Sequence, residues 1–193
     1  MARVKDLEAR LQRAEQQLTV FQRISRLTVK DLSLSETLQA IVNIVSEFMS
    51  CDSCLLYILD GDELVLCASS NPHPAQIGKV RLQLNEGLTG WVARERRLLA
   101  ISTEAFLDRR FKKFSELPED TYQAFLSVPV IARNRVIGVL NVQHRQPHAH
   151  TGAEMEMLTT VGEQVGCLLA LARMGPDALD HLAHLEFSVS SAK

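Results

Sequence analysis

The sequence contains no long hydrophobic run and no excess of charge of one sign. No stretch approaches the roughly 18 apolar residues that a membrane-spanning helix needs. The N-terminus, MARVKDLEAR, is charged and lacks the apolar core of a secretory signal peptide. The formal net charge is −2, so there is no general electrostatic argument for nucleic-acid binding. We therefore expect a cytoplasmic protein that binds neither nucleic acid nor a membrane.

Cysteines and catalytic motifs are also scarce. The chain has four cysteines, of which Cys51 and Cys54 form a CxxC pair that could bind metal or cycle as a redox disulfide. A zinc site needs two more ligands, and no second CxxC or HxxxH follows at a fitting spacing. Because Cys54 opens an apolar run, we interpret these cysteines as structural. The GxSxG, P-loop, HExxH and GxGxxG motifs are absent, and we expect no enzyme.

The composition suits one folded domain with extra helical ends. The chain has 193 residues, of which 46% are hydrophobic and 23% are charged, enough to bury a core without disulfides. We divide it into an N-terminal amphipathic or coiled-coil helix at 1–30, a domain at 31–174 and a C-terminal tail at 175–193.

Residues 3–30 carry the heptad spacing of a helical seam. Its apolar positions recur at intervals of three and four: Val4, Leu7, Leu11, Ala14, Leu18 and Phe21. This seam predicts pairing with a second copy of the chain. A helix that packs on its own domain, or that lies on a membrane surface, would need a similar amphipathic pattern, so both alternatives stay open.

Two further long helices are expected. The capping-box pattern Ser33–Glu36 precedes a helix near 36–49. A long helix at 153–174 has a second stripe at intervals of three and four: Leu158, Val161, Val165, Leu168 and Ala172. Gly162 and Gly166 lie one turn apart and permit close helix contact.

Six strand-sized runs fill the middle of the chain. They are residues 54–60, 63–69, 80–84, 98–102, 124–132 and 136–144. Asp60-Gly61 predicts a tight hairpin, the short connections predict mostly antiparallel pairing, and Thr89 is a candidate cap for a short helix. These elements indicate an α+β fold. A six-stranded antiparallel sheet would carry the N- and C-terminal helices on one face, with loops and short helices covering the other.

Three motifs in order resemble the GAF domain family. Residues 85–93 (NEGLTGWVA) are similar to its EGL-x-G-x-VA signature, residues 108–111 (DRRF) to its D-x-R-F turn, and residues 126–141 to its SVP-V and IGVL strand pair. The match covers about residues 30–173 and is most similar to the GAF domain of nitrogen-related phosphotransferase enzyme I, although we expect no phosphotransferase domain here. The resemblance implies a GAF/PAS-like fold, a bacterial sensory role and dimerisation through terminal helices. The apolar stripes of both terminal helices suit such dimer seams.

The resemblance also implies a choice of ligands. Family members bind cyclic nucleotides, tetrapyrroles, haem, amino acids or 2-oxoacids, and many bind nothing. GAF-type free methionine sulfoxide reductases use cysteines in the region over the pocket, and residues 80–130 contain none. The NKxxF…DE pattern of cyclic-nucleotide sites lacks its Asn-Lys start here, although Phe111 is kept, and no cysteine lies where a bilin would attach. The cofactor therefore stays unknown.

The candidate pocket lies on the loop-covered face of the predicted sheet. Alternation in the last strand places a partly polar set there: Ile137, Val139, Asn141 and Gln143. The opposite, wholly apolar set would face the helices: Val136, Gly138, Leu140 and Val142. We expect the ligand to contact Tyr57, Trp91, Arg109, Arg110, Phe111, Phe125, Ser127, Asn141 and Gln143. Alternatively, these groups only satisfy local backbone atoms.

Two further groups of side chains are candidate ligand or metal contacts. The segment 94–113 is basic through Arg94, Arg96, Arg97, Arg109, Arg110, Lys112 and Lys113. It would form a lid that pairs with an anionic ligand or would simply be a solvated loop, and Asp108 would cap the turn before Phe111. A loop contains His144, His148 and His150, with no carboxylate at a recognisable ligand spacing. We expect these, and His73, to be surface histidines without a metal.

We therefore expect a stand-alone GAF sensor. It would bind a small molecule, with an anion favoured by the basic segment, and signal through a helical homodimer to an unidentified partner protein. The alternatives are a ligand-free dimerisation adaptor and a redox enzyme that uses Cys51 and Cys54. The sequence identifies neither the ligand nor the partner.

Overall fold

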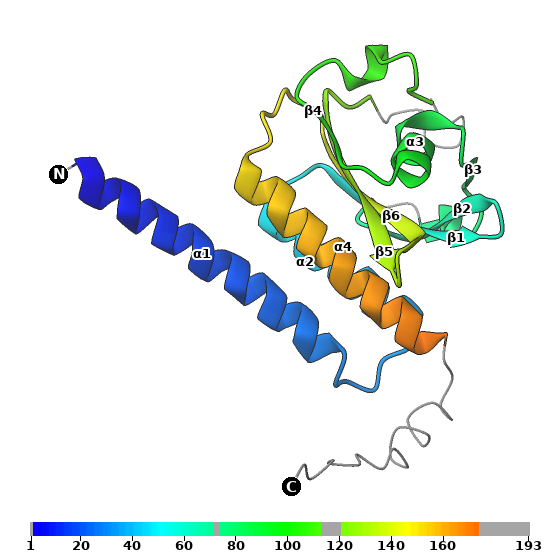
Figure 1. The fold of residues 1–193 in the computed structure, drawn as a ribbon, viewed down its shortest axis with the longest axis horizontal. Coiled ribbons are helices and arrows are strands. Elements are labelled where there is room, and N and C mark those ends of the chain that lie inside the picture. Colours follow the sequence, from blue (N-terminus) through cyan, green and yellow to red (C-terminus); the bar gives the residue numbers. More distant parts are fainter. Residues whose placement is uncertain (1, 72–73, 113–120, 174–193) are drawn as a thin grey trace, which may run out of the picture.

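A computed structural model describes residues 2–71, 74–112 and 121–173. A six-stranded, fully antiparallel sheet has helices on both faces (Figure 1). Its helices are α1 (Ala2–Leu27), α2 (Leu34–Met49), α3 (Gly87–Glu95) and α4 (Gly152–Ala172), with short 3-10 turns at Pro74–Gln76 and Ala105–Leu107. Its strands are β1 (Ser53–Asp60), β2 (Glu63–Ser69), β3 (Arg81–Gln83), β4 (Leu99–Ile101), β5 (Ala124–Ala132) and β6 (Arg135–His144).

The strand order is β3-β2-β1-β6-β5-β4, which confirms the predicted fold class. The terminal helices lie on one side of the sheet, and α3 lies on the other (Figure 1). Within the described ranges, no helix is both long and apolar enough to span a bilayer.

The main core lies between the sheet and the layer formed by α1, α2 and α4. Leu126, Val128 and Leu140 of the sheet pack there against Val45 of α2 and Val161 of α4, and all five side chains are buried. Burial of each such side chain favours folding by about 1.5–3 kcal/mol. This layer therefore holds the sheet from one side and leaves the other side for the candidate site.

Capping boxes begin both α2 and α4. Ser33 Oγ accepts from the Glu36 N–H, and the Glu36 carboxylate accepts from the Ser33 N–H over 2.9 Å, as predicted. Thr151 and Glu154 make the same reciprocal pair at the start of α4. The second box was present in the sequence as Thr-x-x-Glu and was missed.

The glycines of α4 bring the helix against a strand and not against another helix. A Cβ added at Gly166 would lie 2.3 Å from the Ile131 carbonyl oxygen, and one at Gly162 would lie 3.3 Å from Val128 Cγ2. The glycines do permit a close contact, but they make it with β5, so the prediction of a contact with another helix is wrong. The apolar stripe of α4, which was expected to form a second dimer seam, lies mostly inside the domain. Its members Leu158, Val161 and Val165 are buried in the chain's own core.

The two halves of α1 differ. Val20, Ile24 and Leu27 are buried against the domain. Towards the N-terminus, the apolar seam is open, because its members are more than half exposed: Val4, Leu7, Leu11 and Leu18. The C-terminal half thus packs on its own domain, whereas pairing of the other half with a second chain remains a prediction.

A β-bulge reverses the alternation at the start of β6. Val130 pairs with Gly138 and Ile131 with Val136, so Ile137 is an extra residue. Val136 consequently packs on the α3 side and Ile137 on the helical-layer side. This is the opposite of the predicted assignment, because a single inserted residue moves the side chains that precede it to the other face. From Val139 to Gln143 the predicted alternation holds.

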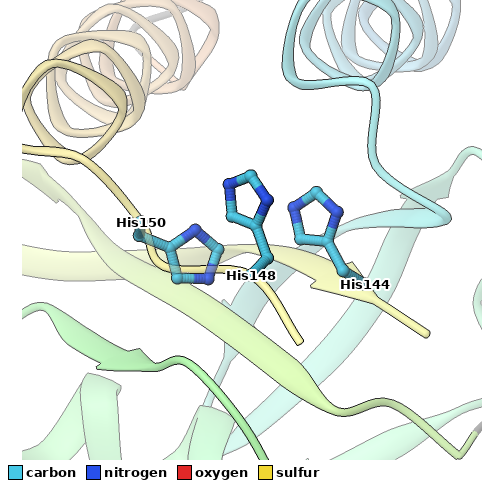
Figure 2. A group of neighbouring side chains, drawn as sticks. All are labelled: His144, His148 and His150. Carbon is cyan, nitrogen blue, oxygen red and sulfur yellow. The ribbon is translucent and has the colours of Figure 1, made fainter. Parts of the chain in front are cut away.

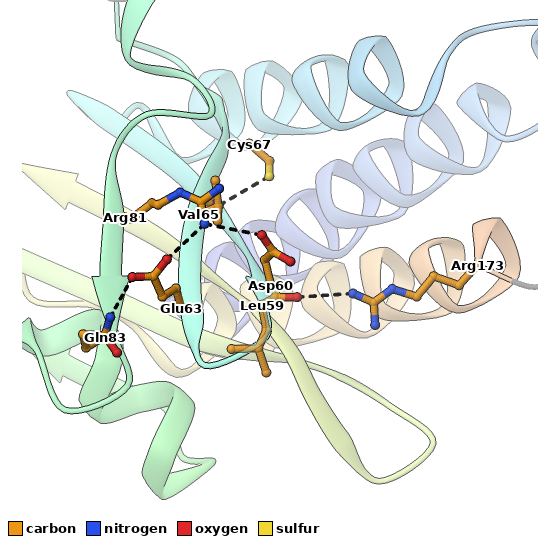
Figure 3. A network of polar contacts seen from close by, with 8 residues as sticks. All are labelled: Leu59, Asp60, Glu63, Val65, Cys67, Arg81, Gln83 and Arg173. Carbon is orange, nitrogen blue, oxygen red and sulfur yellow. Dashed lines mark hydrogen bonds and ion pairs between the residues drawn. The ribbon is translucent and has the colours of Figure 1, made fainter.

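A polar network closes one end of the sheet (Figure 3). Arg81 of β3 pairs with Glu63 at 3.0 Å and Asp60 at 3.4 Å, at the tight turn predicted from Asp60-Gly61. Arg173, at the end of α4, donates to the Leu59 carbonyl over 3.3 Å. These groups are largely exposed to solvent, so the ion pairs contribute little to the stability of the fold.

Candidate functional site

The sheet face under α3 combines an apolar floor with a polar end. Tyr57 of β1 and Val139 of β6 pack with Val92 of α3, and all three are buried. Trp91 is half-buried at the edge of this cluster. The face thus contains two of the aromatic side chains expected to line a ligand pocket, although Tyr57 is only 1% exposed and belongs to packed core.

A chain of hydrogen bonds joins the sheet to α3. Ser127 Oγ donates to Asn141 Oδ1 over 2.6 Å, and Asn141 Nδ2 donates to Thr89 Oγ1 over 2.8 Å. All three side chains are buried. Thr89 had been expected to cap this helix, but α3 begins at Gly87 and Thr89 faces the sheet from the first turn. The network fixes the orientation of the Asn141 amide.

On the same face as this network, two buried oxygens have no hydrogen-bond partner among the described residues. They are Gln143 Oε1 of β6 and Ser53 Oγ of β1. The two residues are directly paired across the strands, so their side chains share the α3-side face with Asn141. Folded proteins seldom leave buried polar atoms unsatisfied, which makes this pair a candidate contact for a ligand.

Aromatic side chains border the same region. Phe125, beside Gln143 in the sheet, is buried against Leu88 and Ala105, with Phe111 packed on the cluster. Phe111 reaches this position from the turn that follows Asp108, whose main-chain carbonyl accepts from the Phe111 N–H over 2.8 Å. Phe125 and Phe111 therefore belong to one apolar cluster.

Arg110 is held from two sides. Its guanidinium makes two hydrogen bonds to the Asp108 carboxylate, at 2.9 and 2.7 Å, and lies 4.6 Å from the centre of the Trp91 ring. These hydrogen bonds lower the pKa of Asp108. Asp108 also accepts from the Arg110 N–H, which agrees with its predicted role in the turn. By contrast, Arg109 is exposed.

Most cations of the basic segment already have partners. Arg94 pairs with Glu95, Lys112 pairs with Glu86 at 2.8 Å, and Arg96 donates to the Asn134 carbonyl over 2.8 Å. A hydrogen bond from Lys112 lowers the pKa of Glu86. This pairing weakens the electrostatic argument for an anion, and the position of Lys113 lies outside the described residues.

The CxxC pair lies against the helical layer. Cys54 is buried in β1, as predicted, and Cys51 is half-buried. Burial raises the pKa of both thiols, that of Cys54 most strongly. A redox pair needs a readily formed thiolate, so this environment argues against that alternative.

The three histidines lie together. His144, at the end of β6, is buried, and His148 and His150 of the following loop are half-buried. The rings of His144 and His148 stack with centroids 4.1 Å apart. The expectation of surface histidines is thus wrong for His144, because the loop folds back over the strand end. His73 lies outside the described residues.

Of the nine predicted ligand contacts, the structure places Ser127, Asn141, Gln143 and Phe125 side by side on β5 and β6. Trp91 and Arg110 form a second group through their ring contact. Sequence reasoning missed Thr89 as a partner of Asn141 and did not consider Ser53. Alternation back from Tyr57 and Leu55 places Ser53 on the same face, so that signal was available.

Comparisons with known proteins agree with this architecture. A family model for the GAF domain matches residues 31–170. The Nif-specific regulatory protein of Herbaspirillum seropedicae is 26% identical over 164 residues, which are 81% of this chain and 30% of that protein. The chain therefore spans only about a third of the length of this relative.

Solved structures give the same result. The GAF domain of an Acinetobacter phosphoenolpyruvate-protein phosphotransferase is 32% identical, with a TM-score of 0.74, over 81% of this chain and 93% of that one. A free methionine-R-sulfoxide reductase from Neisseria meningitidis has a TM-score of 0.70 over 84% and 93% of the two chains but is 15% identical, a likeness of fold alone. Because the family model matches most of the chain, the chain belongs to the GAF domain family.

Proposed function

We propose that this GAF domain is a sensory module that binds a small polar molecule on the face of the sheet that α3 covers. The observation that carries the proposal is the pair of buried, unpartnered oxygens, Gln143 Oε1 and Ser53 Oγ. Leaving a buried polar atom unsatisfied costs about 1–3 kcal/mol. A ligand with hydrogen-bond donors would recover that free energy, so a hydroxyl, amide or ammonium group is the expected contact.

The neighbouring hydrogen bonds support a preorganised site. Ser127 and Thr89 hold the Asn141 amide from both ends, so the wall beside Gln143 loses little entropy on binding. Phe125 and Phe111 supply apolar contact. An anionic group on the ligand would meet Arg109, or Arg110 if it competes with Asp108.

The signal of ligand binding would pass through the layer formed by α1, α2 and α4. β6 carries Asn141 and Gln143 and is joined to α4 by the loop 145–151. Gln17 Nε2 of α1 donates to the Ala153 carbonyl at the start of α4 over 2.9 Å. A ligand that binds one arrangement of β6 more tightly would shift the population of arrangements of these helices. We propose that α1 passes this shift to a partner protein through a homodimer.

Non-denaturing mass spectrometry of the purified full chain tests the proposal. The expected result is a dimer that retains, or gains on incubation with amino acids, 2-oxoacids or nucleotides, a small molecule released on denaturation. A bound ligand should also raise the melting temperature. A bare dimer with no response to any of these compounds would instead favour the dimerisation adaptor, which the exposed seam of α1 also suits.

A matched pair of variants locates the site. Gln143→Leu should abolish the ligand-dependent rise in melting temperature without lowering the melting temperature of the ligand-free protein, because it removes an unsatisfied oxygen. Gln164→Leu is the control, since Gln164 Oε1 of α4 is also buried and unpartnered but lies in the helical layer. An equal ligand response in wild type and Gln143→Leu would contradict the assignment.

We also propose that the domain is not an enzyme. The thiols of Cys51 and Cys54 have raised pKa values, and no cysteine occurs in residues 80–130. An assay for reduction of free methionine sulfoxide should therefore give no turnover, and turnover would overturn this part of the proposal.

A further inference from the structure

Three imidazole rings meet where β6 ends and the chain turns into α4. His144, His148 and His150 lie in a row on the same side of the sheet as α4 (Figure 2). One ring nitrogen of each lies within 4.8 Å of the others, and the His148 and His150 centroids are 4.9 Å apart. Within the described parts of the chain, no other group of histidine, cysteine and carboxylate side chains has a geometry suitable for a metal.

The nitrogens of this cluster are short of hydrogen-bond partners. His144 Nε2 and both ring nitrogens of His150 are buried and have none among the described residues. A buried imidazole normally hydrogen-bonds or binds a metal, because an unpaired polar atom in the interior is unfavourable. A neutral imidazole offers one ring-nitrogen lone pair, so one nitrogen each of His144 and His150 is available to a cation, while the second nitrogen of His150 carries the hydrogen.

His148 is oriented by a carboxylate. Its Nε2 lies 2.9 Å from Glu154 Oε1, while Glu154 Oε2 accepts from the Thr151 N–H over 2.6 Å in the helix cap. With Nε2 donating to Glu154, His148 presents the lone pair of Nδ1. Histidines that bind metals in proteins commonly donate their other ring nitrogen to a carboxylate in this way.

We propose that His144, His148 and His150 form a binding site for a divalent transition metal of the zinc class, with Glu154 as the group that orients His148. Neutral imidazole nitrogen suits Zn²⁺, Co²⁺ and Ni²⁺. Three protein ligands leave a fourth position for water or another ligand.

Metal binding requires a modest closure of the cluster. At a metal–nitrogen distance near 2.0–2.1 Å, tetrahedral ligand atoms lie about 3.4 Å apart, closer than the present limit of 4.8 Å. His144 and His148 stack with an angle of 11° between their planes, so one ring must tilt for both lone pairs to point at one ion. His148 and His150 belong to a loop, where such adjustment is easiest.

The sequence shows no carboxylate at a recognisable ligand spacing near these histidines, but in the structure the capping-box residue Glu154 contacts His148 directly. The site is also separate from the ligand site proposed above, since it lies on the side of α4. The metal site and the ligand site can therefore be tested independently of each other.

The first test uses the untagged full chain, treated with EDTA and then titrated with CoCl₂ or ZnCl₂. Stoichiometric binding of one Co²⁺ per chain should give the visible absorption of a four- or five-coordinate ion, and Zn²⁺ should displace it and raise the melting temperature by several degrees. The absence of both the cobalt spectrum and the zinc-dependent rise would overturn the proposal.

Variants assign the ligands. His144→Gln and His150→Gln should each weaken Co²⁺ binding at least about 100-fold, and Glu154→Gln should weaken it by about 10–100-fold. Glutamine at position 154 still completes the capping box, so that variant keeps the helix start and reports on the carboxylate alone. The melting temperature of each variant in EDTA checks its fold.

The controls are His73→Gln and Cys51→Ser, which should bind Co²⁺ as wild type does. Loss of binding in Cys51→Ser, with retention in the histidine variants, would place the metal at the CxxC and refute the site.

Discussion

Asn141 Nδ2 of β6 donates to Thr89 Oγ1 of α3 over 2.8 Å, and both side chains are buried. This bond joins the sheet to the short helix on the side opposite the helical layer. Its acceptor comes from a residue 52 positions earlier in the chain, so the contact depends on the whole fold.

Replacing Thr89 by valine should destabilise the domain by about 1–3 kcal/mol, because the buried Asn141 amide loses its acceptor at nearly constant side-chain volume. Urea denaturation measures the change. The control is Thr160→Val, whose hydroxyl donates only to the Glu156 carbonyl of its own helix at the surface; its effect should stay within about 0.5 kcal/mol. Equal effects of the two substitutions would contradict a structural role for the network.

Gly166→Ala should destabilise the domain by about 1–3 kcal/mol through overpacking. The added methyl group would lie 2.3 Å from the Ile131 carbonyl oxygen, so α4 and β5 must move apart. Gly152→Ala is the matched control at the start of the same helix, where an added Cβ meets no atom within 4 Å. Its melting temperature should be unchanged or higher. A harmless Gly166→Ala would mean that α4 packs less closely on β5.

Charge placed on the open half of α1 should dissociate a homodimer. Leu11 and Leu18 are 62% and 56% exposed, so Leu11→Glu combined with Leu18→Glu should leave the domain folded. Light scattering after size exclusion at micromolar concentration should change from dimer to monomer, while Gln12→Glu, which adds charge beside the seam, should remain dimeric. A double variant that is still a dimer would exclude this seam as the main interface.

The Asp108–Arg110 pair should make stability depend on acid pH. Because hydrogen bonds from Arg110 lower the pKa of Asp108 in the folded state, the unfolded chain binds the proton more readily. The contribution of the pair is present above the unfolded pKa of about 3.9 and is lost as pH falls through the lower folded pKa. At the partial exposure of this pair it amounts to about 0.5 kcal/mol.

The variant Asp108→Asn tests this contribution by urea denaturation at pH 7, 5, 4 and 3. The stability difference between wild type and variant should be constant from pH 7 to 5 and should shrink towards pH 3. A difference that persists unchanged at pH 3 would show that the carboxylate charge is not responsible.

The regular parts of this fold were predictable because local patterns decide them. The Ser33–Glu36 box, the Asp60-Gly61 turn and the alternation from Val139 to Gln143 each depend on residues close in sequence. The reversal at Ile137 was not predictable in this way, since a bulge is defined by the pairing of two strands.

The candidate sites were predictable only in part. Period-two alternation identified Ser127, Asn141 and Gln143, but the acceptor on Thr89 depends on how α3 packs against the sheet. The histidine cluster has no periodic spacing, because its members are brought together by a loop that returns over a strand end. The Thr151–Glu154 box could have been identified from sequence, and it would have placed a carboxylate near that loop.

The two outermost strands of the sheet, β3 and β4, are each three residues long. A strand that short presents few free backbone groups, so it offers a poor template on which another chain could extend the sheet. The shortness of β3 and β4 therefore disfavours edge-to-edge polymerisation at both edges of the sheet. Any association through the open half of α1 would therefore rest on side-chain contacts and not on extension of the sheet, which would limit the size of the complex.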